Sequence, residues 1–144
     1  MKRCWILGVT VLSCCLSLTA IRAGAWDGEH TTDPLDKVLA DVQAHKAVLV
    51  DAREHAEWNR GHIKGAALIP LSELINWDKD GQFTAEEKAE VAKRIPAGKV
   101  VYIHCAAGGR CVPAAGILKQ LGYDVRPLKP GYADLIKAGF PKAE

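Results

Sequence analysis

Four short apolar segments recur along this chain, and stretches with helical periodicity lie between them. The segments are residues 47–50, 66–69, 100–103 and 125–128, and Arg126 interrupts the last of them. Runs of this length that are apolar at successive positions predict strands buried on both faces, and a helix between two strands allows those strands to pair in parallel. The sequence therefore predicts one α/β layer around a largely parallel sheet, with a site at the carboxyl ends of its strands.

Helix signals fall between these segments. Asp33 and Pro34 have the residue types of an N-cap and a first helical position, and apolar residues follow them at helical spacing. Residues 84–87 read Thr-Ala-Glu-Glu, which is a capping box. A further helix is expected after the third strand, with Pro113 near its start and Gly122 just past its end.

The first 25 residues have the organisation of an export signal. Lys2 and Arg3 supply a positive end, residues 5–12 are almost entirely apolar, and Ala-Gly-Ala at 23–25 suits a signal peptidase. We expect a signal peptide over residues 1–25, cleavage after Ala25, and a periplasmic or secreted domain of residues 26–144 without stable membrane insertion.

Two other interpretations of the leader stay open. The apolar zone that ends at Ile21 is 17 residues long, which is barely enough for an uncleaved membrane anchor. Residues 11–14 read Val-Leu-Ser-Cys, so a lipoprotein signal with acylated Cys14 is the third possibility.

The charge balance excludes one class of partner. The formal net charge is +2, but Lys2, Arg3 and Arg22 lie in the leader, and the remainder has 16 basic against 17 acidic residues. A nearly neutral domain without a basic stripe gives no reason to expect a nucleic-acid partner.

Two of the five cysteines, Cys105 and Cys111, lie beyond the leader. An even number in an exported domain suggests a disulfide, but a bridge between residues this close in sequence closes a very small loop and adds little stability. The surroundings of Cys105 indicate chemistry instead.

Cys105 follows the third predicted strand and begins the sequence Cys-Ala-Ala-Gly-Gly-Arg, residues 105–110. Small residues, including Gly108 and Gly109, allow successive backbone N–H groups to turn toward one point and form an anion-binding nest. The N-terminus of the next helix and the cation of Arg110 add positive potential. All three effects favour a thiolate and predict a nucleophilic Cys105; a buried structural cysteine is the alternative.

These residues resemble the rhodanese family. Cys105, Gly108 and Arg110 match its Cys-x-x-Gly-x-Arg loop. Asp-Ala-Arg at 51–53 and Gly-His-Ile-Lys-Gly-Ala at 61–66 resemble two further signatures of the family, in the same order. The family often has two glycines and a tryptophan after its last strand, whereas this chain has Lys-Pro-Gly-Tyr at 129–132, a departure that bears on substrate preference.

The resemblance implies a rhodanese-like α/β fold, with a central, mostly parallel five-stranded sheet and helices on both faces. It also implies a sulfurtransferase that carries sulfur as a Cys105 persulfide, from a small anionic donor such as thiosulfate to cyanide or a thiol. No cofactor and no metal are expected. The N–H groups of Ala106, Ala107, Gly108 and Gly109, together with Arg110, are the predicted substrate-binding groups.

Two other activities are possible on this fold. Tyrosine-phosphatase loops place five residues between Cys and Arg, and the cell-cycle phosphatases and arsenate reductases of this fold also have longer loops. The four residues between Cys105 and Arg110 resemble the sulfurtransferase type. A persulfide carrier that delivers sulfur to a partner protein would keep the same cysteine.

Three other residues are expected to support the site. Asp51 and Arg53 are interpreted as structural hydrogen-bonding partners at a strand end. His62 is a possible proton donor but is better explained as part of a turn. His104 should point away from the thiol, since neighbouring residues of a strand face opposite sides.

Two features stay open at this point. Cys111 either packs in the first turn of its helix or serves as a redox partner of Cys105. Residues 76–87 resemble an EF-hand calcium loop with Asn at its first position, and the alternative is an Asp-Gly turn that leads into the capping box.

Overall fold

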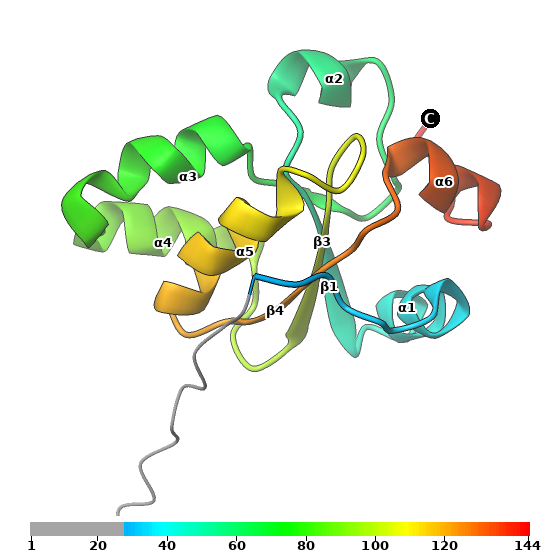
Figure 1. Cartoon of the computed structure of the whole chain (residues 1–144), viewed down its shortest axis with the longest axis horizontal. Coiled ribbons are helices and arrows are strands. Elements are labelled where there is room, and N and C mark those ends of the chain that lie inside the picture. Colours follow the sequence, from blue (N-terminus) through cyan, green and yellow to red (C-terminus); the bar gives the residue numbers. More distant parts are fainter. Residues whose placement is uncertain (1–27) are drawn as a thin grey trace, which may run out of the picture.

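A computed structural model describes residues 28–144. Its strands form one parallel sheet in the order β2-β1-β3-β4 (Figure 1). The strands are β1 (Ala47–Asp51), β2 (Ala67–Leu68), β3 (Val100–His104) and β4 (Asp124–Pro127). The predicted class and parallel pairing are confirmed.

The number of strands was predicted wrongly. The described residues form four strands instead of five, and each coincides with one of the four apolar segments. The fifth strand was expected from the family resemblance alone, without an apolar segment of its own. The remaining strand-like contact is an isolated antiparallel bridge between Ile63 and Lys142.

Helices cover both faces of the sheet. The helices are α1 (Leu35–Gln43), α2 (His55–Asn59), α3 (Leu71–Trp77), α4 (Ala85–Arg94), α5 (Cys111–Gln120) and α6 (Tyr132–Lys137), with a 3-10 turn at Lys79–Gly81. In Figure 1, α1 and α6 lie on one side of the sheet, and α3, α4 and α5 lie on the other.

The central strand β3 divides its side chains between two hydrophobic clusters. Val101 and Ile103 pack with residues of α3, α4 and α5, whereas Tyr102 packs with residues of α1 and α6. All three are fully buried. This alternation follows from the period of two in a strand, and it explains why the segment has to be apolar at successive positions.

The register of the sheet brings the candidate residues to one edge. Asp51, the last residue of β1, pairs with His104, the last residue of β3. The loop that begins at Cys105 therefore starts beside the end of β1, at the carboxyl edge where the sequence predicted the site.

The helix signals had mixed outcomes. The capping box at the start of α4 is confirmed, since Thr84 and Glu87 each accept a backbone hydrogen bond from the other. The Asp33 N-cap was predicted wrongly. Pro34 occupies the cap position of α1 without a side-chain bond, and the Asp33 carboxylate instead accepts hydrogen bonds from Arg126 and Tyr102, both at 2.9 Å. A charged donor on a neighbouring strand competes successfully with a local backbone N–H.

The EF-hand-like segment takes the form of a turn that leads into a helix. Its first position, Asn76, lies inside α3. The last, Glu87, accepts the Thr84 N–H in the capping box at 2.8 Å. Among the described residues, no group of three or more His, Cys, Asp or Glu side chains is placed to hold a metal ion.

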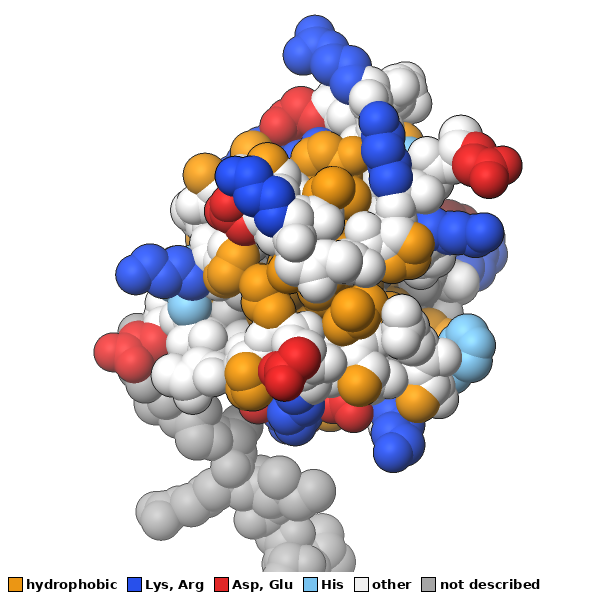
Figure 2. Space-filling view, turned by 90° about the vertical axis from the view of Figure 1, so that its right-hand side faces the viewer, with side chains coloured by type: hydrophobic (Ala, Val, Ile, Leu, Met, Phe, Trp, Pro, Cys, Tyr) orange, Lys and Arg blue, Asp and Glu red, His pale blue; other side chains and the backbone are white. Residues whose placement is uncertain are grey.

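The leader and its three interpretations lie outside the described residues. From residue 28 onward, the chain forms no helix of sufficient length and hydrophobicity to span a bilayer. Figure 2 shows the face over α1 and α6, where Lys and Arg side chains are interspersed with Asp and Glu around hydrophobic groups.

Candidate active site

The Cys105 loop connects the end of β3 to the start of α5, and its backbone N–H groups surround the sulfur. The N–H groups of Ala107, Arg110 and Cys111 hydrogen-bond to the Cys105 sulfur. Gly108 has a φ of 84°, in the left-handed region, which turns the chain between these donors. The loop therefore has the form of an anion-binding nest built around one sulfur atom.

Carbonyl groups of the loop have partners elsewhere. The Cys105 carbonyl accepts the Tyr132 N–H at 2.9 Å. The Gly108 carbonyl accepts the Cys111 N–H at 3.2 Å and lies 3.1 Å from His30 Nε2. These two carbonyl oxygens therefore accept hydrogen bonds within or beside the loop.

The pKa of Cys105 falls from 9.0 to about 5 in this environment. The main cause is a hydrogen bond from the Cys111 thiol, and the three backbone N–H groups add to it, while burial opposes the shift. Cys105 is therefore a thiolate at neutral pH, and the thiolate is the nucleophilic form of cysteine. The thiol donor Cys111 was not foreseen in this role, because sequence spacing does not show where its sulfur points.

The sulfur is more enclosed than a reactive thiol usually is. Cys105 is 1% exposed, whereas its neighbours Ala106, Ala107 and Gly109 are exposed. The thiolate therefore lies at the floor of the loop, beneath an exposed rim. A buried sulfur beneath an exposed rim suits a small substrate or the tip of a larger one.

Arg110 is held by a residue that sequence reasoning missed. Glu57 of α2 accepts two hydrogen bonds from the Arg110 guanidinium, at 2.6 and 2.7 Å. The pKa of Glu57 falls to about 2, chiefly because of this contact. The side chains are 29% and 31% exposed, so the pair stands at the rim of the loop. The sequence offered one indication that α2 lies near the loop, because α2 follows β1 and the end of β1 adjoins the loop.

Asp51 and Arg53 form a buried platform next to the loop. Both oxygens of Asp51 accept hydrogen bonds from Arg53 at 2.8–3.0 Å, and the pair is almost completely buried. Arg53 also donates to the Gly61 carbonyl at 2.9 Å and lies 4.0 Å from the centre of the Tyr132 ring. These contacts connect the end of β1 with the segments before β2 and after β4.

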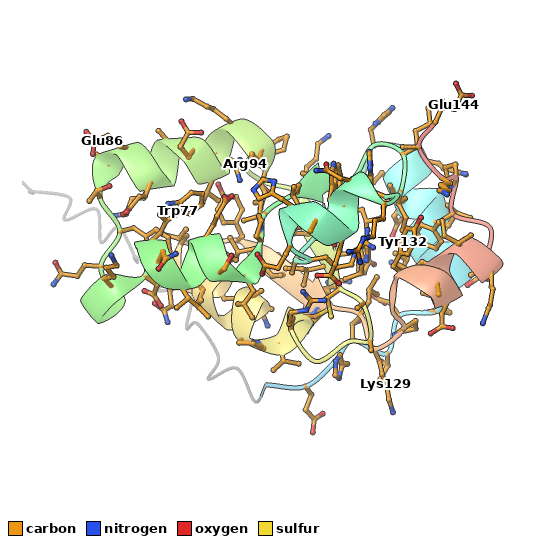
Figure 3. All side chains as sticks on the ribbon, turned by 90° about the horizontal axis from the view of Figure 1, so that it is seen from above. Trp77, Glu86, Arg94, Lys129, Tyr132 and Glu144 are labelled. Carbon is orange, nitrogen blue, oxygen red and sulfur yellow. The ribbon has the colours of Figure 1, made fainter. Side chains whose placement is uncertain are left out.

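The residues that follow β4 close the loop from the α6 side (Figure 3). Tyr132 stands between α2 and α6 in that view and donates its N–H to Cys105. Gly131 packs so closely that a Cβ there would come within 1.8 Å of the Ala106 carbonyl oxygen. The Lys-Pro-Gly-Tyr departure noted in the sequence therefore lies directly against the reactive loop.

Of the two histidines considered, His62 was the possible proton donor, and His104 was expected to point away from the thiol. His62 stacks on Trp58 with ring centres 3.7 Å apart, and its Nδ1 lies 3.2 Å from the Trp58 carbonyl oxygen. His104 is fully buried, with Nε2 3.6 Å from Asp51 Oδ2. Burial lowers the pKa of His104, so it is neutral at pH 7.

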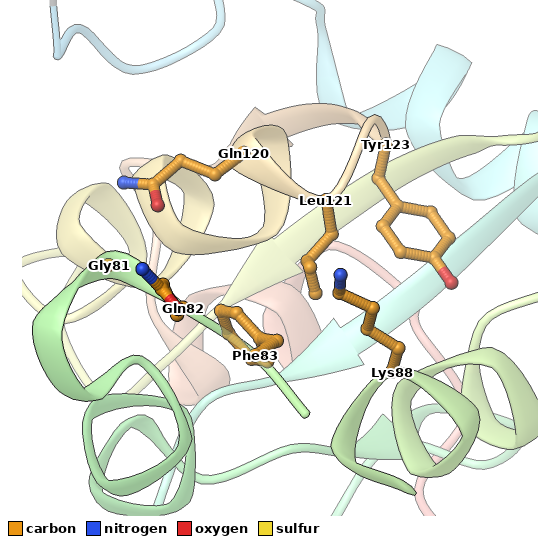
Figure 4. A pocket seen from close by; sticks show the side chains of 7 residues that line it. All are labelled: Gly81, Gln82, Phe83, Lys88, Gln120, Leu121 and Tyr123. Atoms are coloured by element: carbon orange, nitrogen blue, oxygen red, sulfur yellow. The ribbon is translucent and has the colours of Figure 1, made fainter. Parts of the chain in front are cut away.

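A hollow of about 450 Å³ lies at the C-terminal end of α5, away from the end that the Cys105 loop joins (Figure 4). Phe83, Lys88, Leu121 and Tyr123 are among the residues that line it. Helix α5 has ten residues, so this hollow is about 15 Å from Cys111 at the start of the helix. It is separate from the nucleophile.

A family model described as the rhodanese-like domain matches residues 34–138, which include the whole sheet and the Cys105 loop. The chain belongs to the rhodanese-like family. The human single-domain sulfurtransferase TSTD1 is 25% identical, with a TM-score of 0.58 over 72% of this chain and 92% of that one. A rhodanese-related protein from Thermoplasma volcanium is 27% identical, with a TM-score of 0.54 over 73% and 93% of the two chains.

Some curated relatives are much longer proteins. A tRNA uridine(34) hydroxylase of Bacillus pumilus is 32% identical over 94 residues, which are 62% of this chain and 26% of that protein. A probable adenylyltransferase/sulfurtransferase, MoeZ, of Mycobacterium tuberculosis is 32% identical over 78 residues, 54% of this chain and 17% of that protein. This rhodanese-like chain thus spans about a quarter or less of these two relatives, and sulfur transfer in general is the chemistry that the comparisons support.

Proposed function

We propose that this rhodanese-like protein is a sulfurtransferase that moves sulfane sulfur from a small anionic donor, such as thiosulfate, to cyanide or a thiol through a Cys105 persulfide. The observation that carries the proposal is the ring of N–H donors around a sulfur whose pKa is about 5. Such a ring holds a thiolate before the reaction and the charge that develops during it.

The first step loads the enzyme. The Cys105 thiolate attacks the outer sulfur of thiosulfate, the S–S bond of the donor breaks, and sulfite leaves with the bonding electrons. In the second step, cyanide or a thiolate attacks the terminal sulfur of the persulfide and restores the Cys105 thiolate. The protein returns to its starting oxidation state with either acceptor.

Arg110 orients the anionic donor in this proposal, and Glu57 competes with that donor. The Glu57 carboxylate occupies both terminal nitrogens of the guanidinium. The guanidinium has further N–H groups for an incoming anion, but the adjacent Glu57 carboxylate repels that anion and competes with it for Arg110. The Asp51–Arg53 platform and His62 hold the surrounding segments in position.

Mass spectrometry tests the loading step directly. After treatment of the purified chain with thiosulfate, we expect one added sulfur atom on the peptide that contains Cys105, and turnover when cyanide follows. Cys105→Ser should remove both the adduct and the turnover. An adduct without turnover on cyanide would instead identify a persulfide carrier. No adduct on Cys105 in the folded protein would refute the proposal.

We also propose that the protein is exported, with cleavage after Ala25. The support is the charged end, apolar run and small residues of the leader. N-terminal sequencing of the protein from its native cells should begin at Trp26. An intact leader would indicate a membrane anchor, and a lipid on Cys14 would indicate a lipoprotein; either result contradicts this cleavage site.

A further inference from the structure

A second thiol touches the reactive sulfur. Cys111 is the first residue of α5, is fully buried, and donates its thiol hydrogen to the Cys105 sulfur. Both cysteines are free and belong to the same buried cluster. The transfer described above uses Cys111 only as a hydrogen-bond donor, although a thiol in contact with a sulfur-loaded cysteine is also a potential nucleophile.

The charge on Cys105 controls the reactivity of Cys111. The pKa of Cys111 is raised, first because its thiol donates a hydrogen bond to the Cys105 thiolate and second because of burial. Cys111 therefore stays protonated while Cys105 is unloaded. When Cys105 carries a second sulfur, the negative charge moves to the terminal atom. Cys111 then faces a neutral sulfur bonded to another sulfur, and the main cause of its inertness is gone.

We propose that Cys111 is a resolving thiol that attacks the Cys105 sulfur of the persulfide, forms a Cys105–Cys111 disulfide and releases the terminal sulfur as hydrosulfide. The inference rests on the proposed persulfide of Cys105. The resolving step is a second way for the bound sulfur to leave, because the protein then releases it as hydrosulfide without an external sulfur acceptor.

The step is balanced in atoms and electrons. The bond between the two sulfurs of the persulfide breaks, and the bond between the two cysteine sulfurs forms. The terminal sulfur leaves with the electron pair, and the proton of Cys111 passes to it or to water. The terminal sulfur is reduced by two electrons and the cysteine pair is oxidised by two. A thiol reductant then returns both cysteines to their starting state.

The location of the disulfide suits a bond that is made and broken. Residues 105 and 111 are six apart, so the closed loop is small and gains little stability from chain entropy. A disulfide needs the sulfurs to come within about 2 Å, so the loop has to tighten. Gly109 faces open space, which leaves room for that movement. A disulfide that closes so small a loop is therefore expected to be readily reduced.

A time course under anaerobic conditions tests the proposal. The full chain is loaded with thiosulfate, freed of excess donor, and followed by intact mass, peptide mapping and hydrosulfide assay. We expect the Cys105 adduct to disappear, a Cys105–Cys111 cross-link to form, and one equivalent of hydrosulfide to appear per loaded chain. In Cys111→Ser, which keeps a hydroxyl donor at this position, the adduct should persist and hydrosulfide release should fall at least tenfold.

Two results would overturn the proposal. One is a wild-type persulfide that lasts as long as that of the serine variant, and the other is hydrosulfide release without the cross-linked peptide. The second readout uses the wild-type chain alone, so it decides the matter even when the variant does not fold. If neither the wild-type chain nor Cys111→Ser shows the adduct, and no Cys105–Cys111 cross-link forms, the sulfurtransferase function itself is overturned, which is a different and separately visible result.

Discussion

Replacing Gly108 by alanine, with Gly109→Ala as a matched control, tests whether the shape of the loop creates the reactive sulfur. The two glycines are adjacent and receive the same added methyl group. Gly108 has a φ of 84°, and a Cβ there would lie 2.5 Å from the Lys129 carbonyl oxygen. Gly109 is outside the left-handed region, and a Cβ there would meet nothing within 4 Å.

The expected changes in unfolding free energy differ between the two variants. At position 108, the left-handed conformation costs a residue with a Cβ about 1–2 kcal/mol. Relieving the overlap with backbone adds about 1–3 kcal/mol, as in other overpacked sites. Gly108→Ala should therefore lose about 2–5 kcal/mol of unfolding free energy and lower the Tm by roughly 10 °C or more. Gly109→Ala should be neutral or gain up to about 1 kcal/mol, because alanine restricts the unfolded chain.

Two measurements on both variants check this reasoning. Thermal unfolding gives the stability, and the ultraviolet absorbance of the thiolate against pH gives the pKa of Cys105. In Gly108→Ala, displacement of the N–H donors should also raise the pKa of Cys105 from about 5 toward its ordinary value. Equal stability and equal thiolate titration in the two alanine variants would refute the account of the loop.

Three further predictions concern the groups around the loop. The rate of persulfide formation should be constant near neutral pH and fall tenfold for each pH unit below about pH 5, because protonation of Cys105 removes the nucleophile. A midpoint of the rate profile near pH 9 would contradict the lowered pKa of Cys105. Glu57→Gln keeps an acceptor for the Glu54 N–H at the start of α2 but weakens the bond to Arg110. The KM for thiosulfate should therefore fall several-fold. An unchanged or higher KM would show that Glu57 does not compete with the donor. Asp51→Ala leaves the Arg53 charge buried without its partner and should cost about 3–5 kcal/mol in urea unfolding. Asp51→Asn, which retains an acceptor, should cost clearly less, and equal losses would argue against the ion pair as the cause.

The burial of Cys105 gives these experiments a common context. In the proposed reaction, a small anionic donor approaches this enclosed thiolate beside the Arg110–Glu57 pair. The same enclosure keeps Cys111 close to the loaded sulfur. In the proposed scheme, transfer to an external acceptor and internal release by Cys111 therefore compete for the same persulfide.

Features that depend on neighbours in sequence were predicted well from the sequence alone. The four strands and the helix that begins at the Thr84 capping box are encoded by hydrophobic runs and by residues three apart, so the relevant partners lie within one turn or one strand. The position of the Cys105 loop was also predictable, because a turn after a buried parallel strand must lie at the carboxyl edge of the sheet.

Tertiary structure alone decided which side chains meet at that edge. Glu57 and Arg110 are 53 positions apart, and Asp33 lies 93 positions from the Arg126 that draws it away from the cap of α1. The direction of the Cys111 thiol likewise depends on how α5 packs on the sheet. Such contacts arise because the order of the strands in the sheet differs from their order in the chain. Packing then brings several possible partners near each polar group, and the strongest hydrogen bond or ion pair among them forms.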